Sequence, residues 1–260
     1  MSGGAADGRG NAVEIRGLTK VFNAGRPDAV EALVDIDLII APGEFVSLIG
    51  PSGCGKSTQL RLIANLTEPT TGEVLVNGKP ARSARLDQDY GMAFQQAGLF
   101  EWRSVAKNVE LPLELKGWDK AGRRARAIEM LELVKLPEFA EHFPWQLSGG
   151  MQQRVAIARA LAVHPPLLLM DEPFGALDPV TRAELHREFR RIQGEVRKTV
   201  VIVTHDMGEA FALASRVGVL ADGAIAQIDA PQRLARSTDP RVRPLLEPLF
   251  EAGAAAGSRA

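Results

Sequence analysis

Two apolar runs of strand length stand in the second half of the chain, with a charged segment between them. Residues 167–170 and 199–203 are continuous, largely apolar runs, whereas residues 179–196 are charged and have helical spacing. Runs without a polar face are typical of parallel strands that are covered by helices on both sides. The pattern therefore predicts an α/β core in this region.

The first half of the chain begins with shorter strand-like segments. We predict strands at 13–16, 32–40 and 44–49, and a hairpin formed by 72–76, the turn Asn77-Gly78 and the residues from Lys79 onward. The strand at 44–49 runs directly into a glycine-rich loop. An apolar-periodic segment at 57–65 follows that loop and predicts a helix. A strand, a loop and a helix in this order are one half of a βαβ unit.

The middle of the chain has a different pattern, with apolar side chains three and four residues apart. Helices are predicted at 110–115, 120–134 and 152–163. We therefore expect one domain over residues 12–236, with a helical subdomain inserted at about 96–163. A hairpin at 217–228 and a helix at 231–236 end that domain. The Gly- and Ala-rich residues 1–11 are expected to be a flexible leader, and 237–260 a C-terminal tail.

Composition narrows the class of protein. Among 260 residues, 45% are hydrophobic, and 31 Lys and Arg balance 32 Asp and Glu to give a net charge of −1. These values are ordinary for a globular domain, and the lack of a basic surplus argues against nucleic acid as a partner. The single cysteine, Cys54, rules out an internal disulfide. No stretch reaches the roughly 18 apolar residues that a membrane-spanning helix needs.

The glycine-rich loop carries the first candidate chemistry. Residues 50–57 read Gly-Pro-Ser-Gly-Cys-Gly-Lys-Ser and fit the pattern G-x-x-x-x-G-K-[ST], between a predicted strand and a predicted helix. In that setting backbone N–H groups cradle phosphate, the lysine reaches the β- and γ-phosphates, and the serine hydroxyl ligates Mg²⁺. The alternative is a glycine-rich turn of no function. The residues expected to contact the nucleotide are Gly50, Pro51, Ser52, Gly53, Cys54, Gly55, Lys56, Ser57 and Thr58.

A pair of carboxylates ends the apolar run at 167–170. Asp171 and Glu172 follow it directly, and ligands of open α/β sheets bind at the carboxyl ends of the strands. We expect Asp171 to hold Mg²⁺, through water, and Glu172 to act as the general base toward the attacking water. Taken alone, the pair could also be a solvated acidic turn.

A third motif completes a family resemblance. The stretch Leu147-Ser148-Gly149-Gly150-Met151-Gln152 precedes a predicted helix, with Ser148 as a natural N-cap. With the two motifs above, it resembles the LSGGQ signature of ATP-binding-cassette (ABC) ATPases, here with Met151 in place of glutamine. The resemblance covers about residues 13–228. It implies a P-loop NTPase (RecA-like) α/β core, an N-terminal antiparallel β subdomain and an inserted α-helical subdomain.

The resemblance also implies roles for further residues. Phe22 would stack on adenine, or else be a core residue that closes an early strand. Gln95, in preference to Gln96, would contact Mg²⁺ and the attacking water, and His205 would contact the γ-phosphate. The loop that ends at Asp178 would let two ATPase subunits sense each other. The signature residues Ser148, Gly149 and Gly150 of one copy would cover the γ-phosphate bound to another.

The implied partners follow from the same resemblance. ATP and Mg²⁺ would be the cofactors, and ATP would join two copies of the chain in a sandwich homodimer. Two transmembrane permease subunits would hold that dimer at the cytoplasmic face of the cell membrane, with a substrate-binding protein as an indirect partner. About 90 residues separate the phosphate loop from the signature, too few for the long coiled coil of DNA-maintenance ATPases. A soluble, non-transport ABC ATPase is the other alternative.

The transported solute is suggested by local sequence only. Residues 172–178 and Pro144-Trp145-Gln146 resemble importers of nitrate, sulfonate, taurine and pyrimidine precursors. We take that class as the main hypothesis. Gly98-Leu99-Phe100 and residues 178–182 instead resemble ATPases of glycine-betaine and quaternary-amine importers, which is the alternative. Trp145 is expected to pack against the signature helix.

Overall fold

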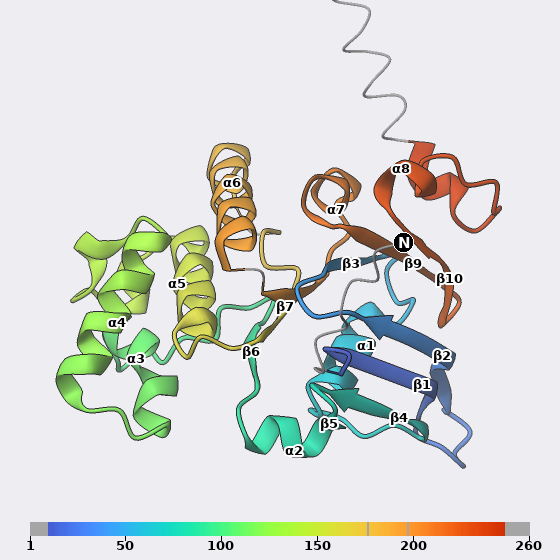
Figure 1. Ribbon diagram of the computed structural model, residues 1–260, viewed down its shortest axis with the longest axis horizontal. Coiled ribbons are helices and arrows are strands. Elements are labelled where there is room, and N and C mark those ends of the chain that lie inside the picture. Colours follow the sequence, from blue (N-terminus) through green and yellow to red (C-terminus); the bar gives the residue numbers. More distant parts are fainter. Residues whose placement is uncertain (1–9, 176, 197, 248–260) are drawn as a thin grey trace, which may run out of the picture.

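The computed structural model describes residues 10–175, 177–196 and 198–247, and within them the chain forms two β-sheets and a separate group of helices (Figure 1). The larger sheet has the strand order β10-β9-β3-β8-β7-β6, and all neighbours are parallel except β10 and β9. Its strands are β3 (Phe45–Ile49), β6 (Tyr90–Ala93), β7 (Leu167–Asp171), β8 (Thr199–Val203), β9 (Arg216–Ala221) and β10 (Ala224–Asp229).

The central strands of this sheet are covered on both faces. Every residue of β3, β7 and β8 is buried. Alternate residues of β7 enter different cores: Leu168 and Met170 pack with the helical part, whereas Leu167 and Leu169 pack toward the second sheet. Two-sided burial explains why these strands have no polar face in the sequence.

The second sheet is antiparallel and has the order β2-β1-β4-β5. It lies at the lower right of Figure 1, with α1 between it and the parallel sheet. Leu60, Leu62 and Ile63 of α1 share one core with side chains of both sheets. The elements are β1 (Val13–Phe22), β2 (Val30–Ile40), α1 (Lys56–Ile63), β4 (Thr71–Val76), β5 (Lys79–Pro80) and α2 (Ala81–Leu86).

The helical part lies on the opposite side of the parallel sheet from β1, β2 and β4 (Figure 1). Each of its three α-helices begins at a side-chain cap, because Ser104, Asp119 and Ser148 each accept a hydrogen bond from a backbone N–H of the first turn. Apolar faces of these helices pack on one another and on the sheet. The elements are α3 (Val105–Leu115), α4 (Lys120–Leu133), η1 (Pro137–Phe139), η2 (Pro144–Gln146) and α5 (Gly149–Leu161).

Two further helices follow strands of the parallel sheet, one after β7 and one after β8. They are α6 (Pro179–Val196) and α7 (Met207–Leu213), which contact each other. A short helix, α8 (Pro231–Leu234), follows the hairpin of β9 and β10. The structure describes no helix that is long and apolar enough to cross a membrane.

The predicted fold class is confirmed, and the differences have local causes. β1 extends beyond the predicted 13–16 because the strand continues past Gly17 through a bulge that disrupts the alternation. β6, which the pattern did not predict, contains Gly91, where a Cβ would come within 2.1 Å of the Ala160 carbonyl oxygen. α2 was missed because only two alanines of it are buried, and α7 because it is short.

Trp145, which precedes the signature helix, lies largely at the surface. It is 63% exposed and stacks on Phe143, with ring centroids 4.6 Å apart. Its expected packing against α5 stays a prediction.

Candidate functional site

The phosphate loop joins β3 to α1, as its sequence predicts. β3 is wholly buried, so the loop leaves a fixed point of the sheet. Gly55 is the N-cap of α1 and supplies no side-chain acceptor to the first turn. The N–H groups at the start of α1 therefore have no side-chain cap, and such a helix end favours an anion.

Two glycines of the loop are required by space as well as by conformation. A Cβ on Gly50 (φ 153°) would lie 2.2 Å from the Leu220 carbonyl oxygen, and one on Gly55 (φ 102°) would lie 2.5 Å from that of Ala32. Both contacts are with backbone, which cannot move aside like the end of a side chain. The loop is thus packed against β2 and β9, and no side chain fits at either position.

Lys56 is buried within its own loop. It is 7% exposed, and its ammonium donates hydrogen bonds to the Gly50 and Pro51 carbonyl oxygens at 2.8 and 2.9 Å. These acceptors hold the side chain in place without neutralising its charge. A buried cation beside uncapped N–H groups favours a polyanion such as a triphosphate.

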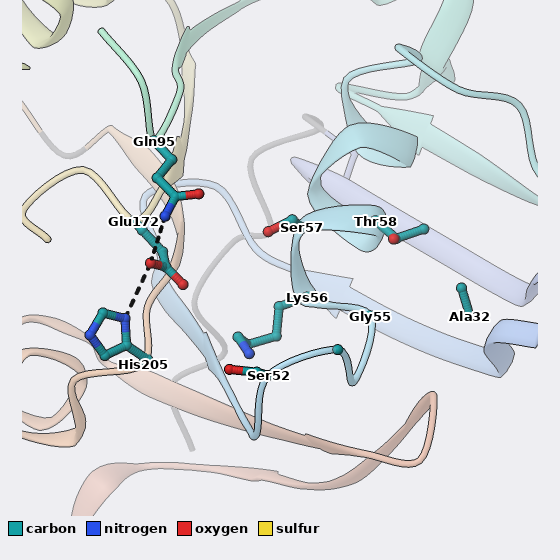
Figure 2. Close-up of a pocket in the computed structure, with 10 residues that line it drawn as sticks. Ala32, Ser52, Gly55, Lys56, Ser57, Thr58, Gln95, Glu172 and His205 are labelled. Atoms are coloured by element: carbon teal, nitrogen blue, oxygen red, sulfur yellow. Dashed lines mark hydrogen bonds and ion pairs between the residues drawn. The ribbon is translucent and has the colours of Figure 1, made fainter.

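A pocket of about 510 Å³ opens beside this loop. Figure 2 shows Lys56 and Ser57 on one side of it, with Gln95, Glu172 and His205 facing them. The residues that line it are Ala32, Ser52, Gly53, Gly55, Lys56, Ser57, Thr58, Gln95, Glu172 and His205.

Strand order explains why residues far apart in sequence meet here. β3, β8, β7 and β6 are neighbours and parallel, so their carboxyl ends lie along one edge of the sheet. The phosphate loop follows β3, His205 follows β8, Glu172 follows β7 and Gln95 follows β6. This edge is the usual position of ligands in open α/β sheets.

Asp171 and Ser57 form the candidate Mg²⁺ position. The Ser57 hydroxyl donates a hydrogen bond to Asp171 Oδ1 at 2.8 Å, and Asp171 is 3% exposed. Neutral and anionic oxygens are the donors that Mg²⁺ prefers, and Mg²⁺ is usually held by one or two carboxylates together with phosphates and water. Among the described residues no group of three His, Cys, Asp or Glu could form a complete protein cage. The donor set fits a nucleotide-bound Mg²⁺.

Glu172 is held by its backbone and by two neighbours. Its φ is +46°, a left-handed conformation that is strained in a residue other than glycine, and its N–H donates to the Val203 carbonyl at 2.8 Å. Oε2 accepts a hydrogen bond from Gln95 Nε2 at 3.3 Å and lies 3.2 Å from His205 Nδ1. Figure 2 shows both contacts converging on this carboxylate. Gln96 does not line the pocket.

Two other groups of predicted residues lie outside this pocket. Ser148, Gly149 and Gly150 are at the start of α5, where Ser148 Oγ accepts a hydrogen bond from Met151 N at 3.3 Å. Asp178 caps α6 by accepting from Val180 N and Thr181 N at 3.1 and 3.0 Å. A hydrogen bond with the Thr181 side chain, and then these backbone contacts, lower the pKa of Asp178. Ala176 of the same loop lies outside the described residues. These groups do not complete the site within one chain.

Phe22 ends β1 and is 40% exposed, so the alternative that it is a core residue is wrong. It pairs with Val30 at the start of β2, and the Lys20 ammonium lies 5.0 Å from its ring centroid. Ala32, two residues after Val30, lines the pocket. Ala32 was not predicted as a site residue, and no chemistry in its side chain could have indicated it.

Further groups beside His205 were also not predicted. Asp206 caps α7 and pairs with Arg182 of α6. Glu209 of α7 is 4% exposed; burial, and then the nearby Asp206, raise its pKa to about 8. Burial lowers the pKa of His186, whose Nε2 lies 4.0 Å from Glu209 Oε2. No sequence motif marked these residues, because their proximity depends on how α6 and α7 pack.

Known proteins match most of the chain. It is 43% identical over 229 residues to the glycine betaine/carnitine/choline transport ATP-binding protein OpuCA of Bacillus subtilis, covering 86% of this chain and 59% of that protein. It is 48% identical over 223 residues to the methionine import ATP-binding protein MetN of Nocardia farcinica, covering 84% and 66%. The chain thus spans about three fifths of the length of the first of these relatives.

A solved structure and a family model agree with these matches. The ATP-binding cassette MJ0796, described as a dimeric post-hydrolysis state bound to ADP and Pi, superposes with a TM-score of 0.78 at 39% identity, covering 84% of this chain and 98% of that one. The model of a family described as ABC transporter matches residues 33–175. Since these residues include the phosphate loop, the signature and the acid pair, this chain belongs to the ABC transporter family.

Proposed function

We propose that this chain is the ATP-hydrolysing subunit of a bacterial ABC importer for a small solute. The observation that carries the proposal is the convergence of Lys56, the Ser57–Asp171 pair and Glu172 on one pocket at the carboxyl edge of the parallel sheet. The domain would extend over residues 12–236, with the helical subdomain at about 96–163.

The phosphate loop would bind the triphosphate. The uncapped N–H groups at the start of α1 and the Lys56 ammonium would face its charge. Phe22 lies exposed at the end of β1 and would stack on adenine. Ser57, Asp171 and Gln95 would hold Mg²⁺. When bound, the metal neutralises charge on the phosphate oxygens.

Glu172 would act as the base toward water. The water oxygen bonds to the γ-phosphorus, the bond between that phosphorus and the β,γ-bridging oxygen breaks, and the water proton passes to the Glu172 carboxylate. Gln95 and His205 both contact Glu172 Oε2 and would fix the position of that carboxylate and the water. The products are ADP and phosphate.

A second copy would complete each site. Ser148, Gly149, Gly150 and Asp178 stand outside the pocket of their own chain, which supports a role toward the nucleotide bound to a partner copy. The dimeric state described for MJ0796 supports the same arrangement. ATP would thus join two copies head to tail, and hydrolysis would release them.

Transport requires partners that this chain does not supply. We propose two permease subunits that hold the dimer at the cytoplasmic face of the membrane, with a substrate-binding protein as an indirect partner and no nucleic acid. The name of OpuCA refers to glycine betaine, carnitine and choline, which are quaternary amines, and that of MetN refers to methionine. The similarity to OpuCA supports the quaternary-amine alternative over the nitrate, sulfonate and taurine class that the sequence first suggested. Gly98-Leu99-Phe100 and residues 178–182 favour it as well.

Two experiments test the proposal. The purified full chain should release phosphate from Mg²⁺-ATP, and Glu172→Gln should lose that activity; a wild-type chain without activity would contradict the ATPase. In the source cell, deletion of this gene should abolish uptake of one of labelled glycine betaine, choline, methionine, taurine or nitrate. Loss of taurine or nitrate uptake alone would restore the first hypothesis. An active ATPase with every uptake unchanged would favour a non-transport ABC protein.

A further inference from the structure

Helices α6 and α7 begin side by side, each at an aspartate cap. Asp178 caps α6, and Asp206 caps α7 through a hydrogen bond from Glu209 N to Oδ1 at 3.0 Å. Leu177 and Asp178 directly precede α6, and His205 directly precedes Asp206. Leu177, Asp178 and the histidine that lines the pocket therefore lie at adjacent helix ends.

Arg182 joins these two helix ends. In the first turn of α6, its Nη1 donates to Asp206 Oδ2 at 3.2 Å and its Nη2 donates to the Leu177 carbonyl oxygen at 3.1 Å. Asp206 thus uses one carboxylate oxygen as a helix cap and the other to hold Arg182. The planar guanidinium spans both acceptors at once, which a lysine ammonium could not do in the same way.

Helix stability does not explain this arginine. A cation in the first turn of a helix is opposed by the positive end of the helix dipole. The ion pair is also partly exposed, with 30% of the Arg182 side chain and 37% of the Asp206 side chain accessible, and such pairs contribute little to stability. What Arg182 does supply is a fixed relation between Leu177 and Asp206.

The contacts continue from Asp206 to the acid pair. His205, its neighbour in the chain, places Nδ1 3.2 Å from Glu172 Oε2 (Figure 2). A shift of Leu177 would therefore move Arg182, then Asp206, and then the imidazole beside the carboxylate. Displacements of about 1 Å at such a site can cost a hundredfold in rate.

We propose that Arg182 is a positioning residue that joins the start of α6 to His205 through Asp206. Arg182 holds Asp206 against Leu177, and so holds the neighbouring imidazole where it meets Glu172. The inference rests on the proposed ATPase function and adds to it a residue that positions His205.

The variants are chosen to separate geometry from charge. Arg182→Gln removes both contacts, Arg182→Lys keeps the charge without the two-point bridge, and Asp206→Asn keeps a good helix cap while it removes the ion pair. Arg241→Gln is the matched control, because it breaks an Arg–Asp pair with Asp239 at 2.8 Å in the C-terminal segment, away from the pocket.

The first readout is steady-state hydrolysis by the full chain together with thermal unfolding. We expect Arg182→Gln and Asp206→Asn each to lower kcat at least about tenfold, with KM within about twofold, and Arg182→Lys to be intermediate. The double variant should be no slower than the slower single one, as expected of two residues that act through one contact. The proposal would be overturned if kcat were unchanged in the single variants, or if the losses of kcat were additive in the double variant. It would also be overturned if a fall in Tm showed that unfolding accounts for the loss of kcat.

The second readout does not depend on ATPase activity. The chain has four histidines, so their imidazole NMR signals can be assigned. The His205 signals should change in Arg182→Gln. They should also change in Arg182→Lys, where the charge is retained and only the two-point bridge is lost. The His142 signals should stay unchanged in these variants, and the His205 signals should stay unchanged in the Arg241→Gln control. If the His205 signals of both Arg182 variants were identical to those of wild type, the positioning role would be overturned, whether or not the chain hydrolyses ATP. A wild-type chain that hydrolyses no ATP would contradict only the proposed function.

Discussion

The Ser57 hydroxyl donates a hydrogen bond to Asp171 Oδ1 at 2.8 Å, across 114 residues of sequence. It ties the first turn of α1 to the end of β7, so the phosphate loop and the acid pair have a fixed separation. Both groups are oxygen donors, Ser57 in the lining of the pocket and Asp171 buried behind it. The contact is therefore the structural basis of the proposed Mg²⁺ position.

Ser57→Ala should weaken Mg²⁺ binding and leave the buried Asp171 carboxylate without this donor. We expect the Mg²⁺ concentration for half-maximal ATPase activity to rise about 10–100-fold, by analogy with losses of groups that hold metal ligands. A Mg²⁺ titration of phosphate release measures it. Ser83→Ala, on the exposed side of α2, is the control. An unchanged titration would remove Ser57 from the metal site.

Glu172→Gln keeps the size of the side chain and its contacts with Gln95 and His205 but cannot accept a proton. The expected loss of kcat is about 10²–10⁴-fold, the usual contribution of a general base, while ATP affinity stays near that of wild type. Light scattering should then find an ATP-dependent dimer that persists. Glu73→Gln, in the exposed pair with Arg16, serves as control. Substantial turnover by Glu172→Gln would assign the base elsewhere.

Gly55→Ala and Gly78→Ala form a matched pair for the cost of a Cβ in the phosphate loop. Both glycines have positive φ, but a Cβ at Gly78 meets no atom within 4 Å, whereas one at Gly55 lies 2.5 Å from the Ala32 carbonyl oxygen. Gly78→Ala should lower the free energy of unfolding by about 1–2 kcal/mol. Gly55→Ala should lose about 1–3 kcal/mol more through overpacking. If urea denaturation gave equal losses of unfolding free energy for the two variants, β2 would be able to move away from the added Cβ without an energetic cost.

The burial of Glu209 makes stability depend on pH. Its pKa is raised to about 8 in the folded protein, chiefly by burial, so at neutral pH the folded chain holds a proton that the unfolded chain has lost. The free energy of unfolding should therefore fall as pH rises toward 8, by up to about 1.4 kcal/mol per pH unit from this group. His186, with its lowered pKa, contributes the opposite slope until about pH 7.5, one unit above the ordinary value, where it is neutral in both states. This contribution is the same in wild type and in a Glu209 variant that keeps His186.

Glu209→Gln tests that assignment. Urea denaturation at several pH values between 6.5 and 8 should give a smaller pH slope for the variant than for wild type. Glu73→Gln again provides the comparison, since its carboxylate is exposed. Parallel slopes for wild type and Glu209→Gln would mean that Glu209 is ionised in the folded chain.

Alkylation of Cys54 should block the binding of ATP. The thiol is buried in the phosphate loop, and its Sγ lies 3.7 Å from the Lys56 ammonium. An added N-ethylsuccinimide group cannot fit there without displacing the loop or the phosphates. We expect ATP affinity to fall at least about tenfold, which equals about 1.4 kcal/mol of binding free energy. Mass spectrometry verifies full modification, and calorimetry then measures the affinity. Cys54→Ala treated in the same way should bind as before; equal binding by both proteins would contradict the prediction.

Much of the site was predictable because its parts are contiguous in sequence. The phosphate loop carries its glycines, Lys56 and Ser57 within eight residues, between a strand and a helix that the apolar pattern marks. The acid pair follows an apolar run directly. Local chemistry and periodicity determine these features, since each depends on neighbours within a few residues.

Tertiary structure decided the relations between these parts. The convergence of Gln95 and His205 on one oxygen of Glu172 depends on β6 and β8 flanking β7. The bridge from Arg182 to Asp206, the place of Ala32 and the raised pKa of Glu209 depend on packing between elements far apart in the chain. A sequence determines which residues can bind phosphate or a proton. Strand order and helix packing decide which of them meet, because burial and distance belong to the assembled fold.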